Sequence, residues 1–201
     1  MKPLGRDFYL RPTEEVARDL LGKVIVRQAR GRRVSIRIVE VEAYLGIDDP
    51  AAHTYGGRRT PRNEPMWGAG GHAYVYFTYG MHHCMNAVTR AGGVPEAVLI
   101  RGGEPLEGIA AMRRRRGPGR RVHELARGPA CVCAALAVDR RHSGLDLTTG
   151  ETVWIEPGEP IADDAVARAP RVGVDYAGDA ASWPLRFLLR DHPCVSKPPS
   201  R

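Results

Sequence analysis

The chain has 201 residues, with 30 lysines and arginines against 23 aspartates and glutamates, so its formal net charge is +7 at pH 7. This length predicts one domain over residues 1–201 with a sizeable core, and the charge favours a polyanionic partner over an acidic small molecule. Only Lys2, Lys23 and Lys197 are lysines. All other basic residues are arginines, whose planar guanidinium suits bidentate phosphate contacts.

The cysteines and the apolar runs argue against two further classes of protein. Cys84, Cys131, Cys133 and Cys194 form no C-x-x-C pair and have no histidine at zinc-ligand spacing, which predicts reduced thiols and neither a metal nor another cofactor. The longest apolar run, 130–138, is too short to cross a bilayer. We therefore expect a cytoplasmic protein without a membrane partner. We also expect a monomer.

The first predicted elements are a helix and a β-hairpin. Residues 13–21 combine a candidate N-cap at Thr13, acidic side chains in the first turn and an apolar stripe, and Gly22 would end this helix. A short strand over 23–27 then leads through a turn at Gly31 into a longer strand. This pattern predicts antiparallel pairing.

The longer strand begins the stretch 36–53, IRIVEVEAYLGIDDPAAH, in which polar and apolar residues alternate. Alternation places Glu40, Glu42 and Tyr44 on the same face as two isoleucines. Because the isoleucines need burial, we expect Glu42 where an apolar floor meets a cavity, which makes its carboxylate a candidate general base. The alternative, equally compatible with this stretch, is a strand end whose two glutamates pair with nearby arginines.

Two segments that follow are candidates for binding. The loop over 46–71 is rich in Gly, Pro, Asp and Arg but contains aromatic residues, which is typical of a binding loop rather than of disorder. Residues 72–89 then predict a β-hairpin with Tyr79 and Met81 at its tip. Exposed residues of this kind either insert into a partner, for instance a stack of bases, or pack on their own domain.

The second half of the chain predicts short elements with fewer signals. We expect strands over 97–101, 152–155, 171–174 and 185–190, a helix over 104–112 with Pro105 in its first turn, and a core helix over 129–138. The arginine run between 113 and 121 is either a solvated loop or a phosphate contact. The candidate phosphate contacts come from the 46–71 loop and from this run. They are Arg58, Arg59, Arg62, Arg113 and Arg114.

Six of these side chains could form a pocket for a flat, hydrogen-bonding ring, because tyrosines can sandwich a base while histidine and asparagine contact its edge. They are Glu42, Tyr44, His53, Tyr76, Asn86 and Arg101. The motifs around them, VEVEAYLG, AAHTYGGRRTPRN, YVYFTYGMHHCMN and VLIRGGEPLEG, resemble the alkyladenine (3-methyladenine) DNA glycosylase family in order and spacing. The resemblance covers nearly the whole chain.

The resemblance implies an α+β fold, a single domain with a curved, barrel-like antiparallel sheet surrounded by helices and with a protruding β-hairpin. It also implies hydrolysis of the N-glycosidic bond of alkylated or deaminated purines flipped out of double-stranded DNA, with 3-methyladenine, 7-methylguanine, hypoxanthine and ethenoadenine as the substrate range. In this family the catalytic glutamate would be Glu42, Arg101 would help to hold the water and the sugar-phosphate, and the base would lie between Tyr44, His53 and Tyr76.

The remaining implied roles concern insertion and discrimination. Tyr79 would enter the duplex in place of the extruded nucleotide, with Met81 beside it, and Asn86 would crowd the 2-amino group of guanine. Ala51 would line the purine edge and Val174 would close the pocket. A departure from the family pattern is Cys131, where a basic residue is common, and this affects one phosphate contact.

Two other classes of protein share some of these sequence features. A non-catalytic RNA- or DNA-binding module with a barrel like the one appended to a formyltransferase would also use antiparallel strands, aromatic residues and arginines. Such a module has no use for a carboxylate near the backbone it attracts, so Glu42 favours the enzyme. A zinc deaminase would need an H-x-E motif and a downstream P-C-x-x-C, and the sequence has neither.

Overall fold

An eight-stranded antiparallel sheet organises the part of the chain that the computed structural model describes, residues 2–198. Its hydrogen-bonded order is β3-β4-β5-β2-β1-β6, and β8 pairs with both β2 and β7. The strands are β1 (Val24–Ala29), β2 (Arg32–Tyr44), β3 (Ala73–Thr78), β4 (His82–Thr89), β5 (Glu96–Glu107), β6 (Val153–Glu156), β7 (Val166–Ala169) and β8 (Arg186–Leu189).

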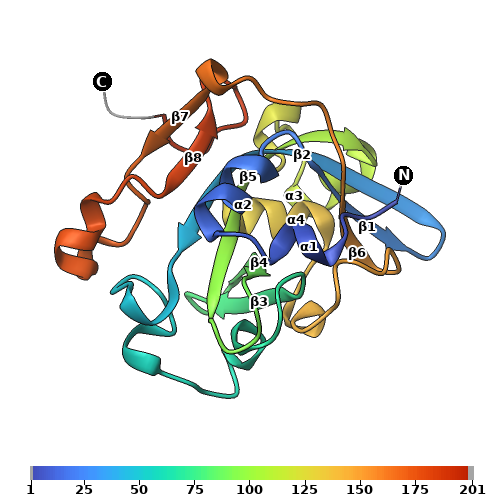
Figure 1. The fold of residues 1–201 in the computed structure, drawn as a ribbon. Coiled ribbons are helices and arrows are strands. Elements are labelled where there is room, and N and C mark those ends of the chain that lie inside the picture. The colour runs from blue at the N-terminus through green and yellow to red at the C-terminus, as the bar shows by residue number, and fades with distance from the viewer. Residues whose placement is uncertain (1, 199–201) are drawn as a thin grey trace.

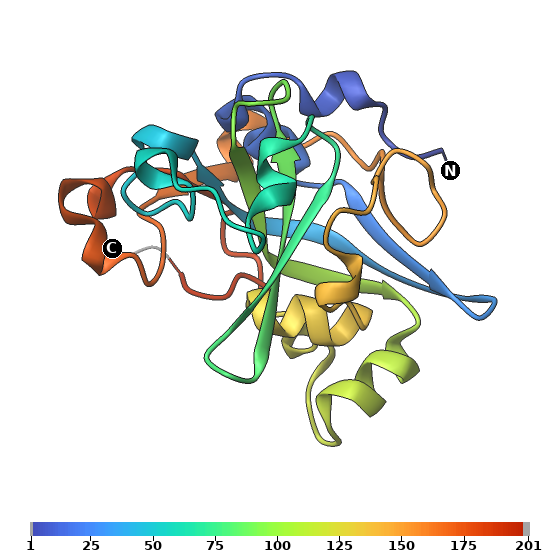
Figure 2. The same cartoon turned by 90° about the horizontal axis from the view of Figure 1, so that it is seen from below.

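Helices cover both faces of this sheet. The α-helices are α1 (Arg6–Tyr9), α2 (Thr13–Leu20), α3 (Ile109–Arg116) and α4 (Pro129–Leu136). Figures 1 and 2 show α1 and α2 on one side of the sheet and α3 and α4 on the other. This arrangement explains why both alternating sets of β2 side chains are buried, Ile36 and Ile38 as well as Val39 and Val41. The predicted α+β fold with a curved sheet among helices is confirmed (Figure 1).

β2 is the strand on which the rest of the sheet is assembled. One edge of β2 pairs first with β1 and then, at Glu40–Glu42, with β8, while the other edge pairs with β5. The pairing with β5 shifts register on both sides of Glu40. The predicted turn at Gly31 is present, with φ of 50° at Arg30 and 71° at Gly31, as a two-residue hairpin with the sheet's twist requires.

The second predicted hairpin is also confirmed and protrudes from the body of the protein (Figure 2). Its two-residue turn has φ of 51° at Tyr79 and 66° at Gly80. Tyr79 is 85% exposed and Met81 is 70% exposed. The interpretation that this tip packs on its own domain is therefore wrong for the free protein.

The structure corrects the helix expected over 104–112. β5 continues to Glu107, and α3 begins only at Ile109, after Gly108 with φ of 74°. The extra length is stabilised by β2, because Pro105 pairs with Ile36 and Glu107 with Ser35. The local signal of a proline in a first helical turn is therefore outweighed by pairing with a distant strand.

Three further expectations also need correction. Arg113–Arg116 belong to α3 and are not part of a loop. Residues 171–174 are not a strand but irregular backbone with a bend at 172–173, and β7 at 166–169 provides the strand instead. Thr13 does not cap α2, because its hydroxyl lies 2.6 Å from that of Thr89 and donates to Glu96. None of the helices in residues 2–198 is long and apolar enough to cross a membrane.

Candidate active site

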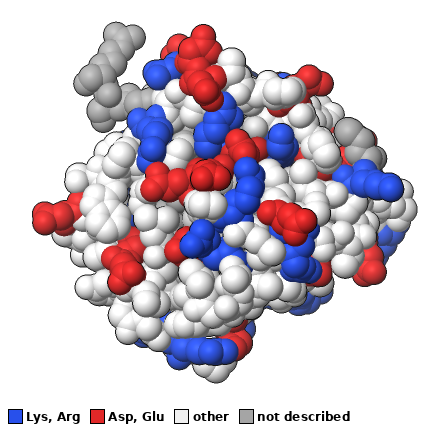
Figure 3. All heavy atoms as spheres, viewed as in Figure 1, with Lys and Arg blue, Asp and Glu red and all other residues white. Residues whose placement is uncertain are grey.

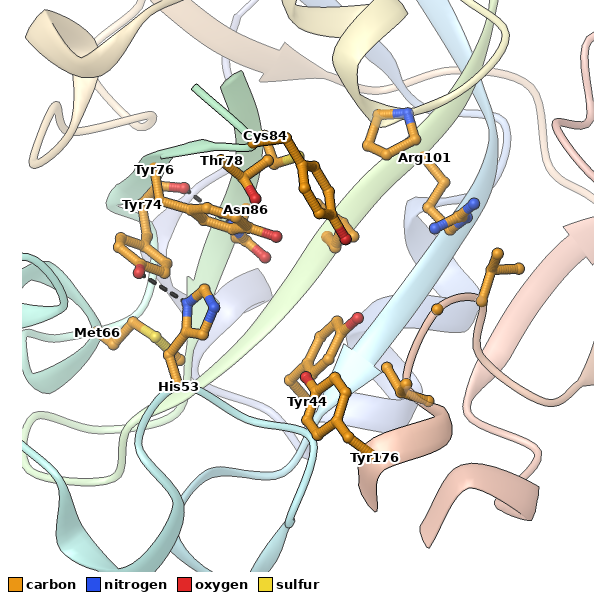
Figure 4. A pocket seen from close by; sticks show the side chains of 16 residues that line it. Tyr44, His53, Met66, Tyr74, Tyr76, Thr78, Cys84, Asn86, Arg101 and Tyr176 are labelled. Atoms are coloured by element: carbon orange, nitrogen blue, oxygen red, sulfur yellow. Dashed lines mark hydrogen bonds between the residues drawn. The ribbon is translucent and has the colours of Figure 1, made fainter. Parts of the chain in front are cut away.

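A cavity of about 420 Å³ opens between the β3–β4 hairpin, the end of β2 and the segment 172–176 (Figure 4). A volume of this size is within the usual range for small-molecule sites. Six of its lining side chains are aromatic, and they come from β2, β3, the 46–71 loop, the hairpin tip and the segment 172–176: Tyr44, His53, Tyr74, Tyr76, Tyr79 and Tyr176. The long loop therefore contributes to a site, as its composition predicted.

The aromatic side chains form two opposite walls. Figure 4 shows His53, Tyr74 and Tyr76 on one side of the cavity and Tyr44, Tyr176 and Arg101 on the other. His53 Nδ1 lies 2.9 Å from the Tyr74 hydroxyl, and the rings of His53 and Tyr76 are 4.6 Å apart, edge to face. The wall of His53, Tyr74 and Tyr76 is thus held by contacts among its own side chains, and the space between the two walls suits a flat ring.

Glu42 lies directly behind the wall formed by Tyr44 and Arg101. Its side chain is fully buried and is not itself part of the cavity lining. The Tyr44 hydroxyl donates to Glu42 Oε2 at 2.9 Å, and the Val172 N–H donates to Oε1 at 2.7 Å. Arg101 Nη1 lies 3.3 Å from Oε1. The carboxylate therefore contacts three groups that line the cavity.

Arg101 also contacts Glu40, which extends the buried charges away from the cavity. Arg101 Nε donates to Glu40 Oε1 at 3.3 Å, Arg186 Nη1 donates to the same oxygen at 2.9 Å, and the Ser196 N–H donates to Oε2 at 2.6 Å. Both glutamates thus pair with arginine, as one interpretation of the strand predicted. The other interpretation expected Glu42 itself at a cavity, whereas its carboxylate lies behind the lining, in contact with the lining residues Tyr44, Val172 and Arg101. Its role as a general base stays a prediction.

Burial governs the ionisation of this pair. It raises the pKa of Glu42, although Arg101, the Val172 N–H and the Tyr44 hydroxyl oppose the shift. Burial alone would lower the pKa of Arg101, but Glu42 and Glu40 together raise it, so the guanidinium keeps its charge. The result is a carboxylate of increased basicity held beside a fixed cation.

His53 is a neutral ring in this setting. Burial, with a smaller effect of the charges on Arg62 and Arg58, lowers its pKa to about 4. At pH 7 the imidazole is uncharged, so it neither repels a cationic ring nor supplies a proton as an imidazolium would. Asn86 lies deeper on the same wall, with its amide donating to the Tyr74 carbonyl at 3.0 Å.

Some of the other expected site residues line the cavity and some do not. Val174 and Tyr79 line the cavity, whereas Met81 at the same hairpin tip does not. Ala51 is buried in a small apolar cluster with Val174 and does not line the cavity. Its carbonyl accepts a hydrogen bond from Tyr176 at 3.2 Å, so Ala51 acts on the wall only indirectly.

The five candidate phosphate contacts differ in their exposure and in the groups that they contact. Arg62 lies against the pocket wall, with its guanidinium 5.3 Å from the Tyr76 ring. Arg59 forms an ion pair with Glu64 and stacks on Trp67. Arg58 is an exposed residue of the same loop, and Arg113 and Arg114 are exposed on α3.

Cys131, where a basic residue was expected, has an arginine beside it. Arg116 at the end of α3 places Nη2 2.8 Å from Cys131 Sγ. Arg116 Nε donates to the Leu125 carbonyl at 3.0 Å, which fixes the guanidinium in this position. A positive charge is therefore present at this place, although it comes from another helix.

Sequence reasoning did not identify the buried ion pair beneath Tyr44. Arg171 Nη2 donates to Asp49 Oδ1 at 2.8 Å, both side chains are fully buried, and the guanidinium lies 4.8 Å from the centre of the Tyr44 ring. Asp49 also accepts from the backbone N–H groups of Leu45 and Ala51. The one available signal was the Asp-Pro-Ala turn in IDDPAAH, since aspartate commonly accepts hydrogen bonds from nearby backbone in turns.

Tyr176 was also missed, although it lines the cavity and is 71% exposed. Within residues 2–198, no group of three or more His, Cys, Asp and Glu side chains is arranged to hold a metal ion. Aromatic walls over a buried carboxylate and guanidinium are typical of an enzyme that encloses a flat ring.

Comparisons with known proteins agree with this site. The family model described as methylpurine-DNA glycosylase matches residues 7–193. Proteins named as candidate 3-methyladenine DNA glycosylases in Methanocella arvoryzae and Desulfitobacterium hafniense are 49% and 47% identical to this chain, each over 98% of it and over 97% and 99% of their own lengths. A protein of the same name in Myxococcus xanthus is 46% identical over 100% of this chain and 98% of its own length.

The chain belongs to the methylpurine-DNA glycosylase family. It is therefore a DNA N-glycosylase of DNA repair, as the sequence motifs predicted, and not a non-catalytic binding module.

Proposed function

We propose that this protein hydrolyses the N-glycosidic bond of 3-methyladenine and related damaged purines, which it flips from duplex DNA into the aromatic cavity. The observation that carries the proposal is the combination of two aromatic walls with Glu42 and Arg101 directly behind one of them. The walls suit a purine ring, and the buried charges lie where its glycosidic bond would be exposed to water.

The chemistry requires one carboxylate and no covalent intermediate. Departure of the base leaves an oxocarbenium-like sugar, so an ionised Glu42 both stabilises the positive charge and accepts a proton from the attacking water. Arg101 holds that water and the sugar-phosphate. The Tyr44 hydroxyl, which donates to Glu42 Oε2 at 2.9 Å, gives up this oxygen to the water when DNA is bound.

The substrate range follows from the charge of the leaving base. A 3-methyl- or 7-methylpurine is already cationic, so it leaves without protonation, and the neutral His53 does not repel it. Hypoxanthine is neutral and needs hydrogen bonds from the pocket in place of a proton. We therefore propose 3-methyladenine and 7-methylguanine as the preferred substrates, with hypoxanthine and ethenoadenine removed more slowly.

The decisive experiment is Glu42→Gln, which keeps the shape of the side chain but removes its charge. Loss of a general base typically lowers the rate about 10²- to 10⁴-fold. We expect single-turnover release of 3-methyladenine from methylated duplex DNA to fall by this factor, while binding to a duplex with an abasic-site analogue persists.

Glu40→Gln is the matched control, because Glu40 contacts the same arginine from one pleat back on β2. It should lower stability more than the rate measured on folded protein. Near-normal turnover by Glu42→Gln, together with a collapse of turnover in Glu40→Gln, would transfer the catalytic role to Glu40.

A further inference from the structure

A second cavity lies far from the base pocket, between the β1–β2 hairpin and α3. Its volume is about 870 Å³, and we call it the arginine groove because six arginines line it: Arg27, Arg30, Arg32, Arg33, Arg114 and Arg115. In contrast, the face of the molecule shown in Figure 3 has basic and acidic side chains lying beside one another. Along the groove, by contrast, the charged residues of the lining are all arginines.

One of the six groove arginines is neutralised and five are not. Arg33 forms ion pairs with Glu107 at 2.8 Å and with Glu156 at 2.7 Å. Among the ion pairs of residues 2–198, none joins a carboxylate to any of the other five, Arg27, Arg30, Arg32, Arg114 and Arg115. Within residues 2–198 the groove therefore presents five guanidinium groups that form no ion pair, although Asp139 lies near enough to Arg27 to oppose the lowering of its pKa.

Arg27 shows that this concentration of charge is unfavourable in the free protein. Burial is the main cause that lowers its pKa, the charges of Arg115 and Arg141 lower it further, and Asp139 opposes the shift. Its Nε atom is buried without a hydrogen-bond partner, while Nη1 donates to the carbonyl groups of Gln28 and Thr152. Arg115 is fixed by a hydrogen bond to the Ala135 carbonyl at 2.6 Å. A bound anion would supply the missing partner and reduce the repulsion between these groups.

The position of the groove separates it from the base pocket. Arg33 lies near the start of β2, and Glu42 lies near its end. At about 3.3 Å per residue, the strand between them spans up to roughly 30 Å. Figure 2 shows the β1–β2 hairpin and the segment around Asp175–Ser182 at opposite ends of the molecule. A duplex centred on the base pocket must therefore extend well beyond the lesion, or a second duplex must bind, for the groove to contact phosphates.

We propose that the arginine groove binds the phosphate backbone of duplex DNA at a site separate from the base pocket. The chemistry favours this ligand because guanidinium groups donate bidentate hydrogen bonds to phosphate oxygens, and a groove of this size and charge matches a continuous polyanion. The site contributes no base contact, so it is insensitive to sequence and to damage.

The test uses two duplexes of different length. An unlabelled 11-bp duplex with a central abasic-site analogue, which extends only about 19 Å to each side, saturates the base pocket without reaching the groove. A fluorescent, undamaged 25-bp duplex is then titrated and followed by anisotropy. We expect wild-type protein to bind it with a Kd of about 10⁻⁴ to 10⁻⁶ M, strongly dependent on salt.

The variant Arg30→Gln/Arg32→Gln removes two exposed charges at the tip of the β1–β2 hairpin. We expect it to weaken binding of the labelled duplex at least tenfold. The slope of the logarithm of the binding constant against the logarithm of the salt concentration should become smaller in magnitude by up to about 1.8, since each phosphate contact contributes about 0.9. The matched control Arg168→Gln/Arg190→Gln removes two exposed charges outside the groove and should change neither quantity. Excision of 3-methyladenine from an 11-bp duplex that carries this base in place of the abasic-site analogue should be unchanged in both variants.

A second arm distinguishes the two sources of phosphate. This arm compares the affinity of a 36-bp lesion duplex with that of the 11-bp duplex when the labelled duplex does not bind. If the 36-bp duplex binds more tightly only when Arg30 and Arg32 are intact, the groove holds the flank of the damaged duplex. This result supports the proposal. Equal behaviour of the groove variant and wild type in both arms would show that the groove is a solvated surface, and the proposal would be wrong.

Discussion

At the scale of single residues, the buried Arg171–Asp49 pair is expected to support the Tyr44 wall. Arg171→Met leaves the Asp49 carboxylate buried without its cation, which typically costs about 3–5 kcal/mol in stability. The double variant Asp49→Asn/Arg171→Met leaves no charge behind and should recover part of this loss. Urea denaturation of the three proteins measures both values. A loss below about 1 kcal/mol in Arg171→Met would mean that water replaces the ion pair.

The ionisation of Glu42 predicts the acid limb of the pH–rate profile. The proposed mechanism needs the ionised form of Glu42, which is lost as the pH falls through its pKa. Since burial raises this pKa, the rate should begin to fall at a pH above the ordinary glutamate value of about 4.3. Single-turnover release of 3-methyladenine, corrected for release without enzyme, would measure the limb. A limb at or below the ordinary value would contradict the dominance of burial.

Asn86 offers a test of discrimination against normal guanine. Its amide is held by the Tyr74 carbonyl and it lines the cavity. We propose that the side chain occupies the space that the 2-amino group of guanine would need. We expect Asn86→Ala to release measurable guanine from undamaged duplex DNA while the wild type releases none. If guanine release stays undetectable while hypoxanthine release changes, selectivity arises elsewhere in the pocket.

Several site residues could be predicted from the sequence, whereas others depend on distant contacts. Tyr44, His53, Tyr76 and Asn86 lie within motifs whose alternation and order already indicate a pocket, and the structure brings all four to one cavity. The role of Arg171 could not be predicted in this way. Its importance comes from a partner 122 residues away in the sequence, and no local pattern encodes such a pair.

At the scale of elements, the β3–β4 hairpin carries the prediction for base flipping. Tyr79 combines high exposure with a position at the rim of the cavity, so it can fill the gap that an extruded nucleotide leaves. Unstacking a base costs a few kcal/mol, and we expect Tyr79→Ala to reduce extrusion strongly, as reported by a fluorescent base analogue beside the lesion.

Leu106→Ala is a suitable control, since Leu106 is a moderately exposed apolar residue on another element. It should leave extrusion unchanged. If Tyr79→Ala also leaves it unchanged, Met81, which is 70% exposed at the same tip, becomes the residue to test for insertion.

The elements that could be predicted from the sequence are those with a strong local pattern. α2 and α4 have apolar residues at helical spacing or throughout, and β3 and β4 alternate around a two-residue turn. The second half of β5 has no alternation and contains Pro105, so only its pairing with β2 makes it a strand. Distant pairing therefore accounts for the main error in the predicted fold.

At the scale of the whole molecule, the scarcity of lysine predicts that the enzyme does not cleave the DNA strand. Strand cleavage through a Schiff base needs a primary amine near the sugar, and arginine cannot supply one. Lys2, Lys23 and Lys197 do not line the cavity. The α-amino group belongs to Met1, which is outside the described residues. We expect no protein–DNA adduct after incubation with abasic duplex and borohydride, with a strand-cleaving glycosylase as the positive control.

A strong trapped band that disappears in Lys23→Arg would overturn this expectation. It would also remove the reason to give Glu42 the role of activating water, because the amine would then be the nucleophile.

The contact between the Ser196 N–H and Glu40 has a consequence for the synthesis of the protein. Glu40, Glu42 and Arg101 are translated early, yet their backbone and side-chain partners include Val172, Arg186 and Ser196. On the ribosome this charged cluster therefore lacks these partners until the segment from Val172 to Ser196 has been synthesised. Since domains generally fold as units during synthesis, we expect the proposed catalytic centre to be complete only after Ser196 has left the ribosome.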